Sequence, residues 1–293
     1  MNGIYKNKIA IFLFLLPALI LFVGIIIVPI IMSAYWSLQD WNGFTDMKFV
    51  GFENYVKLFT SKAISFPKAL GNVFMYAGLS VFVQLPFSLL LALLLAKGRR
   101  GSRSFLSIYF IPVIMSTVVI GQLWLKIYNP DYGILNVALK SMGLDTWAKV
   151  WLGDRGTALM ASFIPTLWQY TGYHMLLMYA GIRNVPPEIK EAALIDGASE
   201  WQINFRIIIP MIKPVLRVCA IISITGALKI FDLIYILTNG GPAHATEVPS
   251  TLLVDMLFLR NSYGMGSAIA VILILMCFFF AILIRKAFKT EVD

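Results

Sequence analysis

The stretch Glu191-Ala-Ala-Leu-Ile-Asp-Gly-Ala-Ser199 is the amphiphilic segment around which the rest of the chain is organised. Proline is tolerated in a first helical turn, where the N–H has no intrahelical partner, so we expect a short helix over Pro187–Ile195. Gly197 then permits a sharp turn, because it has no Cβ. Ser199 followed by Gln202 is typical of a capping box that starts a second helix. The stretch therefore predicts a helix–turn–helix elbow.

The surface of this elbow suits a protein partner. Ala192 and Ala193 have small side chains, so a partner's backbone can approach that side of the first helix closely. Glu191 places a negative charge on the same helix that a partner would have to match. The second short helix is expected to run towards Pro210. The alternative interpretation is an amphipathic surface helix pair that has no partner.

Composition places most of the chain in lipid. Of its 293 residues, 59% are hydrophobic and 13% are charged, whereas soluble domains carry about 25% charged residues. Six apolar segments are long enough to cross a bilayer. We predict an all-α membrane protein with six transmembrane helices, at about residues 9–33, 69–96, 104–125, 157–182, 218–238 and 261–284.

Basic residues indicate which side of the membrane each loop occupies. Lys and Arg are dense near the N-terminus, in 97–103, in 183–217 and after residue 284, and are sparser in the other loops. This asymmetry predicts that both termini and the elbow are cytoplasmic. The net charge of +9 follows this pattern, so it does not indicate a nucleic-acid partner. The sequence shows no set of residues typical of a metal site and no phosphate-binding loop of the GxxxxGK[ST] type.

Polar side chains inside the second and fifth spans are the first candidates for a transport pathway. Asn72, Tyr76, Ser80, Gln84 and Ser88 recur every four residues, and such a stripe faces a pore or a packed neighbour. We expect packing for the serines and pore lining for Asn72 and Gln84. In the fifth span, Lys229 and Asp232 are three residues apart, so they can face each other on one helix. They form either a self-neutralising pair or the border of a wet substrate path.

The fourth span carries a second polar and aromatic face. Thr166, Gln169, Tyr170 and Tyr173 are spaced as one helical face, and Trp168 lies beside them. Aromatic rings cover the C–H faces of sugars, while amides and phenols bond to hydroxyl groups. The alternative for each residue is ordinary helix packing and an interfacial belt.

Three motifs resemble permeases of binding-protein-dependent ABC importers. The elbow is similar to the Glu-Ala-Ala … Gly … Ile-Leu-Pro loop of these proteins, with Ile208-Ile209-Pro210 where Leu is commoner before the proline. The stretch from Leu228 to Pro242 and the segment Gly51-Phe-Glu-Asn-Tyr55 resemble the carbohydrate branch, of the maltose-permease type. The resemblance covers roughly residues 9–288 and implies the type I importer permease fold with a cytoplasmic coupling helix. The implied ATPase-coupling residues are Glu191, Ala192, Ala193, Asp196, Gly197, Ala198, Ile209 and Pro210; the candidate substrate-pathway residues are Gln84, Trp168, Gln169, Tyr170, Tyr173, Lys229 and Asp232.

The resemblance also implies partners and a place in the cell. A second homologous permease subunit would complete a heterodimer in the bacterial cytoplasmic (inner) membrane, with two ABC ATPase subunits, a solute-binding protein, a carbohydrate substrate and membrane lipid. ATP with magnesium would bind the ATPases, and this chain would bind no cofactor and perform no bond chemistry. The expected parts are a first segment over residues 1–35, an extracytoplasmic loop over 36–68 and a permease core over 69–290, with the coupling loop at 184–213.

Two other functions remain open at this point. The same importer class could carry another small polar solute, such as a phosphorylated polyol. An intramembrane enzyme is more remote, because neither HExxH nor GxSxG occurs and neither His174 nor Asp232 has an obvious nucleophilic partner in sequence.

Overall fold

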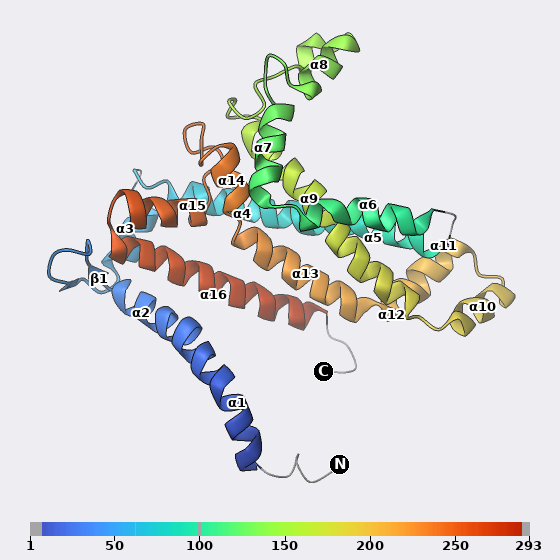
Figure 1. Cartoon of the computed structure of the whole chain (residues 1–293), viewed down its shortest axis with the longest axis horizontal. Helices are drawn as coiled ribbons and strands as arrows, with labels where there is room; N and C mark the ends of the chain where they lie inside the picture. The colour runs from blue at the N-terminus through green and yellow to red at the C-terminus, as the bar shows by residue number, and fades with distance from the viewer. Residues whose placement is uncertain (1–7, 62, 99–100, 289–293) are drawn as a thin grey trace. The chain divides into compact units, whose positions relative to one another are not determined.

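The computed structural model describes residues 8–61, 63–98 and 101–288 (Figure 1). Within these residues the chain is mostly helical, and the only sheet is a two-stranded antiparallel hairpin. The expectations for the two chain ends and for Arg99 and Arg100 fall at least partly outside the described residues. The chain divides into two compact units, residues 1–64 with 252–274 and residues 65–251 with 275–293.

The first unit begins with an almost uninterrupted apolar helix. Residues Ile11–Trp36 form a candidate membrane span of 26 residues, none of which is buried within the chain. A single π-helical turn interrupts its α-helical hydrogen bonding. The elements are α1 (Lys8–Phe22), the π turn η2 (Val23–Ile27), α2 (Val28–Trp36), β1 (Gln39–Asp40), β2 (Lys48–Phe49), α3 (Glu53–Thr60) and η6 (Asp255–Leu259).

The second unit holds most of the helices, and α15 (Pro249–Val254) and α16 (Tyr263–Ala287) are divided between the two units. Its elements are α4 (Phe66–Leu79), η3 (Ser80–Gln84), α5 (Leu85–Ala96), α6 (Ser102–Ile114), α7 (Thr117–Ile127), α8 (Ile134–Ser141), η4 (Asp145–Trp147), α9 (Ala158–Arg183), α10 (Pro187–Ile195), α11 (Glu200–Ile203), η5 (Asn204–Ile208), α12 (Ile209–Met211), α13 (Lys213–Leu228) and α14 (Asp232–Leu237).

A helix or a bent pair of helices occupies each of the six predicted spans. By length and composition, three helices among the described residues can cross a membrane: Ile11–Trp36, Phe66–Ala96 and Tyr263–Ala287. Two bent pairs, Ser104–Ile114 with Thr117–Ile127 and Glu200–Met211 with Lys213–Leu228, raise that number to five. Helix α9 has 26 residues and lies at the fourth predicted span, long enough to cross a hydrocarbon core of about 30 Å.

The third and fifth spans are broken, which the sequence analysis did not predict. Ser104–Ile114 and Thr117–Ile127 meet at 99°, because Met115 and Ser116 adopt extended backbone after Pro112. Proline removes a helical hydrogen bond and clashes with the preceding turn, which favours a break here. The fifth span begins earlier than expected, at Lys213, and its helix stops at Leu228.

Helix α9 is the centre of the second unit. It packs against α5, α6 and α13, and Figure 1 shows these helices running side by side towards α10–α12. Gly172 is required where α6 crosses, because a Cβ there would lie 1.9 Å from the Tyr109 carbonyl oxygen. Met175, Met178 and Ile182 on the same helix are almost fully buried in the largest apolar cluster. The cluster extends to Ala193, Ile203 and Ile208 of the elbow, so the elbow is part of the helical core.

Candidate functional site

The elbow has the local structure that its sequence predicts. Helix α10 spans Pro187–Ile195, and Gly197 has a φ of +78°. Ala198 N–H donates to the Ala193 carbonyl at 2.9 Å, and Gly197 N–H donates to the Leu194 carbonyl at 3.1 Å. These two bonds form the Schellman closure of a helix. The side chain of Ser199 then caps α11 in a complete capping box with Gln202. The angle between α10 and α11 is therefore set by hydrogen bonds on both sides of one glycine.

The outer side of the elbow exposes apolar side chains beside a charge. Glu191 and Ala192 are exposed, whereas Ala193 faces the core. Ile195 is 87% exposed and Trp201 is 68% exposed, and the Trp201 ring lies 3.9 Å from that of Phe205. Asp196, Gly197 and Ala198 line a hollow of about 220 Å³ together with Gln202, Arg206 and Ile207. Ile209 and Pro210 lie in α12, beyond the hollow.

Several contacts join the elbow to the membrane helices. Lys97, at the end of α5, forms an ion pair with Glu200 at the start of α11. Ile203 and Ile208 are buried in the cluster that contains α5 and α9. Burial, and after it the charge of Arg183, lower the pKa of Lys190 on α10. The elbow is therefore packed on, and ion-paired with, the helices that form the unit's core.

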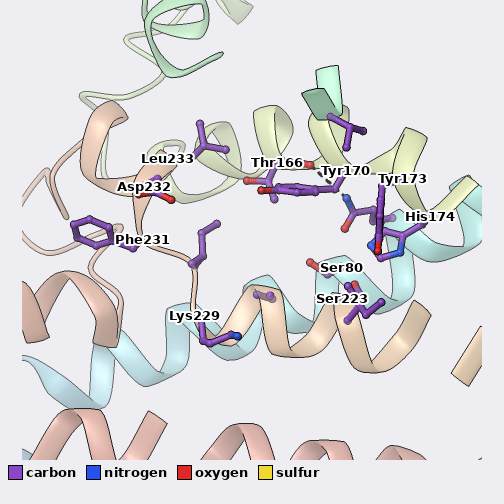
Figure 2. A pocket seen from close by; sticks show the side chains of 16 residues that line it. Ser80, Thr166, Tyr170, Tyr173, His174, Ser223, Lys229, Phe231, Asp232 and Leu233 are labelled. Atoms are coloured by element: carbon purple, nitrogen blue, oxygen red, sulfur yellow. Dashed lines mark hydrogen bonds between the residues drawn. The ribbon is translucent and has the colours of Figure 1, made fainter. Parts of the chain in front are cut away.

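A cavity of about 390 Å³ lies inside the second unit, between η3, α9, α13 and the start of α14 (Figure 2). The break in the fifth span forms part of its wall, because the residues between α13 and α14 face it. The lining residues are Ser80, Gln84, Val113, Thr166, Tyr170, Tyr173, His174, Ile222, Ser223, Gly226, Ala227, Lys229, Ile230, Phe231, Asp232 and Leu233.

Three buried polar atoms in this wall lack a hydrogen-bond partner. They are Thr166 Oγ1, His174 Nδ1 and Ser223 Oγ, for which no partner occurs among the described residues. Each of the three residues is less than 10% exposed. An unpartnered buried polar group is unfavourable by about 1–3 kcal/mol. A molecule with its own hydroxyl groups would remove that penalty, and the rings of Tyr170, Tyr173 and Phe231 supply flat apolar faces beside them.

Five of the seven candidate pathway residues line the cavity, namely Gln84, Tyr170, Tyr173, Lys229 and Asp232. The lining does not include Trp168 or Gln169. Trp168 packs against Trp124, with ring centroids 6.1 Å apart. Gln169 is 2% exposed and its Oε1 has no partner within the described chain.

Of the two alternatives for Lys229 and Asp232, the structure does not show the self-neutralising pair on one helix, and both residues line the cavity. Lys229 follows the last residue of α13, and Asp232 is the first residue of α14. None of the ion pairs found in the described part of the chain joins them, and Figure 2 shows the Lys229 side chain directed away from Asp232. Ser250 Oγ donates to the Ile230 carbonyl, which satisfies one of the backbone groups released by the break.

The polar stripe on the second span serves both packing and cavity lining. Asn72 Nδ2 donates to the Ala245 carbonyl at 3.0 Å and the Glu247 carbonyl at 2.8 Å, so it holds a loop, whereas pore lining was expected. Ser80 lines the cavity, although packing was expected for it. Gln84 does both, since it also donates to the Thr166 carbonyl.

His174, Ser223 and Phe231 are cavity residues that sequence reasoning missed. His174 follows Tyr173 and lies one turn beyond Tyr170, so helical spacing alone would have placed it near the pathway. Ser223 is a single hydroxyl within an apolar span, and no local signal distinguishes it. Phe231 faces the cavity only because the helix is interrupted there.

Several apolar helices of membrane-spanning length, a cavity between helices that holds unpartnered polar atoms, and an exposed elbow packed on those helices are features typical of a membrane transport subunit. Comparisons with known proteins identify which kind. Residues 84–288 match the family described as the binding-protein-dependent transport system inner membrane component. The chain belongs to this family, the permeases of ABC importers, as its elbow motif implied.

Relatives match the chain over nearly its whole length. It is 38% identical over 288 residues to a probable ABC transporter permease protein YurN of Bacillus subtilis, covering 97% of this chain and 98% of that protein. It is 33% identical to the trehalose/maltose transport system permease protein MalF of Thermococcus litoralis, with 96% and 94% covered. The diacetylchitobiose uptake system permease protein NgcF of Streptomyces coelicolor is 31% identical, with 95% and 82% covered.

Solved structures give the same fold. A bacterial ABC transporter involved in the import of the acidic polysaccharide alginate matches with a TM-score of 0.84 over 98% of both chains, at 23% sequence identity. A second structure of a bacterial alginate ABC transporter, in complex with an alginate pentasaccharide-bound periplasmic protein, matches with the same TM-score at 24% identity. The type I importer permease fold expected from the sequence is thereby confirmed.

Proposed function

We propose that this chain is the transmembrane subunit of an ABC importer that moves a sugar or oligosaccharide across the cytoplasmic membrane by alternating access. The observation that carries the proposal is the cavity, in which the unpartnered atoms of Thr166, His174 and Ser223 lie beside tyrosine rings. Rings against C–H faces and polar atoms towards hydroxyl groups are the chemistry by which proteins hold sugars. The carbohydrate permeases among the relatives support the same cargo.

The subunit depends on partners for its energy and its substrate. We assign it a second homologous permease chain as heterodimer partner, two ABC ATPases at the elbow and a solute-binding protein on the opposite side of the membrane. We assign ATP with magnesium to the ATPases, and we assign no ATP site, cofactor or metal to this chain. Closure of the ATPase dimer draws the paired elbows together. Because α10–α12 are joined to α5 and α9, this movement switches the cavity between inward-open and outward-open states.

The proposed orientation places the elbow and both termini in the cytoplasm, on the basis of the charge asymmetry. Glu188 on α10 and Asp145 in η4 are both exposed, so each tolerates a labelling probe. Glu188→Cys and Asp145→Cys should react with a membrane-impermeant thiol reagent from opposite sides of the membrane. Labelling of Glu188→Cys alone in intact cells would reverse the orientation, and labelling of both variants would change the number of spans between the two residues.

The cargo is tested with the assembled transporter and its own binding protein in proteoliposomes. Neutral saccharides should stimulate ATP hydrolysis and accumulate inside the vesicles, whereas phosphorylated polyols should do neither. The relative GgtC of Synechocystis, an osmoprotective compounds uptake permease protein that is 32% identical, favours small polar solutes as the second candidate. Stimulation by such a solute, with no response to any saccharide, would replace the carbohydrate proposal while leaving the importer class intact.

A further inference from the structure

The loop after the first span carries an apolar surface that has no role in the cavity or at the elbow. Phe44 is 87% exposed, Phe49 is 73%, Phe52 is 74% and Val56 is 58%. Phe52 precedes α3 and Val56 lies one turn further on, so both point to the same side of that helix. We call these four residues the phenylalanine face.

Helix α3 separates apolar from charged side chains. Glu53 and Lys57 form an ion pair at 2.9 Å along one side of the helix, and hydrogen bonding to Glu53 raises the pKa of Lys57. Each residue turns a helix by about 100°, so the Glu53–Lys57 side lies roughly a quarter-turn from the phenylalanine face. Asn54 and Leu58 occupy a third side and are buried within the unit. This is the pattern of a helix that lies in an interface with its charges in the headgroup region.

The depth of α3 is fixed by the end of the first span. Asn54 Nδ2 donates to the carbonyls of Ser37 and Gln39 at 2.9 and 2.8 Å, and Ser37 directly follows Trp36, the last residue of the span. Tyr55 donates its hydroxyl hydrogen to Ser37 Oγ at 2.8 Å. Helix α3 is therefore held at the level where the span leaves the hydrocarbon.

The start of α16, a second apolar span, reaches the same level within this unit. Tyr263 N–H donates to the Trp41 carbonyl at 2.9 Å. The Trp41 ring lies 5.2 Å from the ring of Trp36 and 5.2 Å from that of Tyr263. Tryptophan and tyrosine are the residues enriched where membrane meets water, so this cluster marks the boundary beside which α3 is held.

We propose that the phenylalanine face inserts into the lipid headgroup boundary at the Trp36 end of the first span, so that α3 and its hairpin anchor this unit to the membrane surface. A lipid surface fits better than a protein partner because the face is tied to two span ends and borders the aromatic cluster. The proposal goes beyond the transport function. It requires only that the first span and α16 cross a membrane.

Spin labels on neighbouring residues test this anchor in the complete transporter, reconstituted in lipid vesicles. In a chain whose two cysteines are replaced by alanine, Val56→Cys and Lys57→Cys would each carry a nitroxide label. The Val56 label should collide several-fold more often with lipid-soluble oxygen than with a water-soluble nickel chelate, and the Lys57 label should show the reverse preference.

A second pair keeps the test independent of α3. Phe49 and Lys48 are neighbours in β2, and successive strand residues point to opposite faces, so Phe49→Cys should behave like Val56→Cys and Lys48→Cys like Lys57→Cys. Labels that are equally accessible to nickel at Phe49 and Lys48 would show a water-facing surface and overturn the proposal. Labels at Val56 and Phe49 that are shielded from both reagents would identify a protein partner and overturn it as well.

Discussion

At the elbow, Ile195 and Trp201 expose apolar side chains to water, whereas in the cavity Thr166, His174 and Ser223 bury polar atoms without hydrogen bonds. The elbow exposes apolar groups that would be more stable when buried. The cavity buries polar groups that would be more stable with a hydrogen-bond partner. Exposed apolar groups are covered best by a protein surface, and buried polar groups are satisfied best by a polar ligand or water. In the function that we propose, the exposed apolar groups belong to the surface that contacts an ATPase, and the buried polar groups belong to the surface that holds the substrate.

The largest effect is expected from reversing the charge of Glu191, which lies beside the exposed apolar groups of the elbow. Glu191→Lys should reduce ATP-driven uptake at least tenfold, because like charges at a protein contact are unfavourable by several kcal/mol, about 2–5. Membrane insertion should be normal, since Glu191 lies outside every span. Uptake and ATPase co-purification measure the effect. Asp145→Lys, an exposed charge reversal far from the elbow in sequence, is the control, and equal uptake by the two variants would contradict the docking role.

The turn between the elbow helices gives the second largest effect. Gly197 has a φ of +78° and open space around its missing Cβ, so Gly197→Val meets backbone strain of about 1–2 kcal/mol or more, and no steric clash. Coupling of hydrolysis to uptake should fall, while the amount of assembled complex is retained. Gly71→Val, where there is also open space but φ is not positive, should be silent. Coupling that is unchanged in Gly197→Val would show that the turn does not set the elbow angle.

The cavity is tested by two serines with opposite hydrogen-bonding states. Ser223 Oγ has no partner in the described chain, whereas Ser162 Oγ lies 2.6 Å from the Tyr76 hydroxyl. Ser223→Ala should weaken substrate interaction by about 0.5–1.5 kcal/mol, or roughly 2- to 10-fold, without lowering the melting temperature. Ser162→Ala should lower stability by about 1 kcal/mol and leave the apparent KM unchanged. A reduced melting temperature in Ser223→Ala would show that its hydroxyl is satisfied inside the protein.

The smallest effect is expected from the two charges at the cavity rim. Lys229 and Asp232 are separated by the break between α13 and α14, so Lys229→Gln and Asp232→Asn should act independently. The effects of the two changes on KM should add to within about 0.5 kcal/mol in a double-mutant cycle. A coupling energy well above that value would restore the paired arrangement that the sequence suggested.

The elbow could be predicted from the sequence almost residue by residue, because its determinants are local. Two prolines, one glycine and the Ser199–Gln202 box act over a few residues, and the structure confirms α10 at Pro187–Ile195. The roles of these residues towards an ATPase stay a prediction. Six helical segments could also be recognised, since length and apolarity decide where a span lies.

The cavity could be predicted only in part, because its wall depends on contacts between distant segments. Spacing on one helix brought Tyr170 and Tyr173 together, but it could not show that Ser223 of α13 faces the same space. The break at residues 229–231 was missed for a related reason. An apolar run with Lys229 and Asp232 three residues apart is typical of a helix, and the stabilisation of the broken form comes from Ser250 and from the packing of α14 on α7.

The contact between α7 and α14 bears on how the protein is made. A Cβ on Gly121 of α7 would lie 2.5 Å from Ile236 of α14, and Ile120 is buried against Leu233 and Leu237. Each helix is one half of a broken span, and part of its apolar surface is covered by the other helix. Helix α7 leaves the ribosome long before α14, and the residues from Tyr128 to Phe231 are synthesised in between. The packing of the third span on the fifth can therefore form only after the fifth has been synthesised.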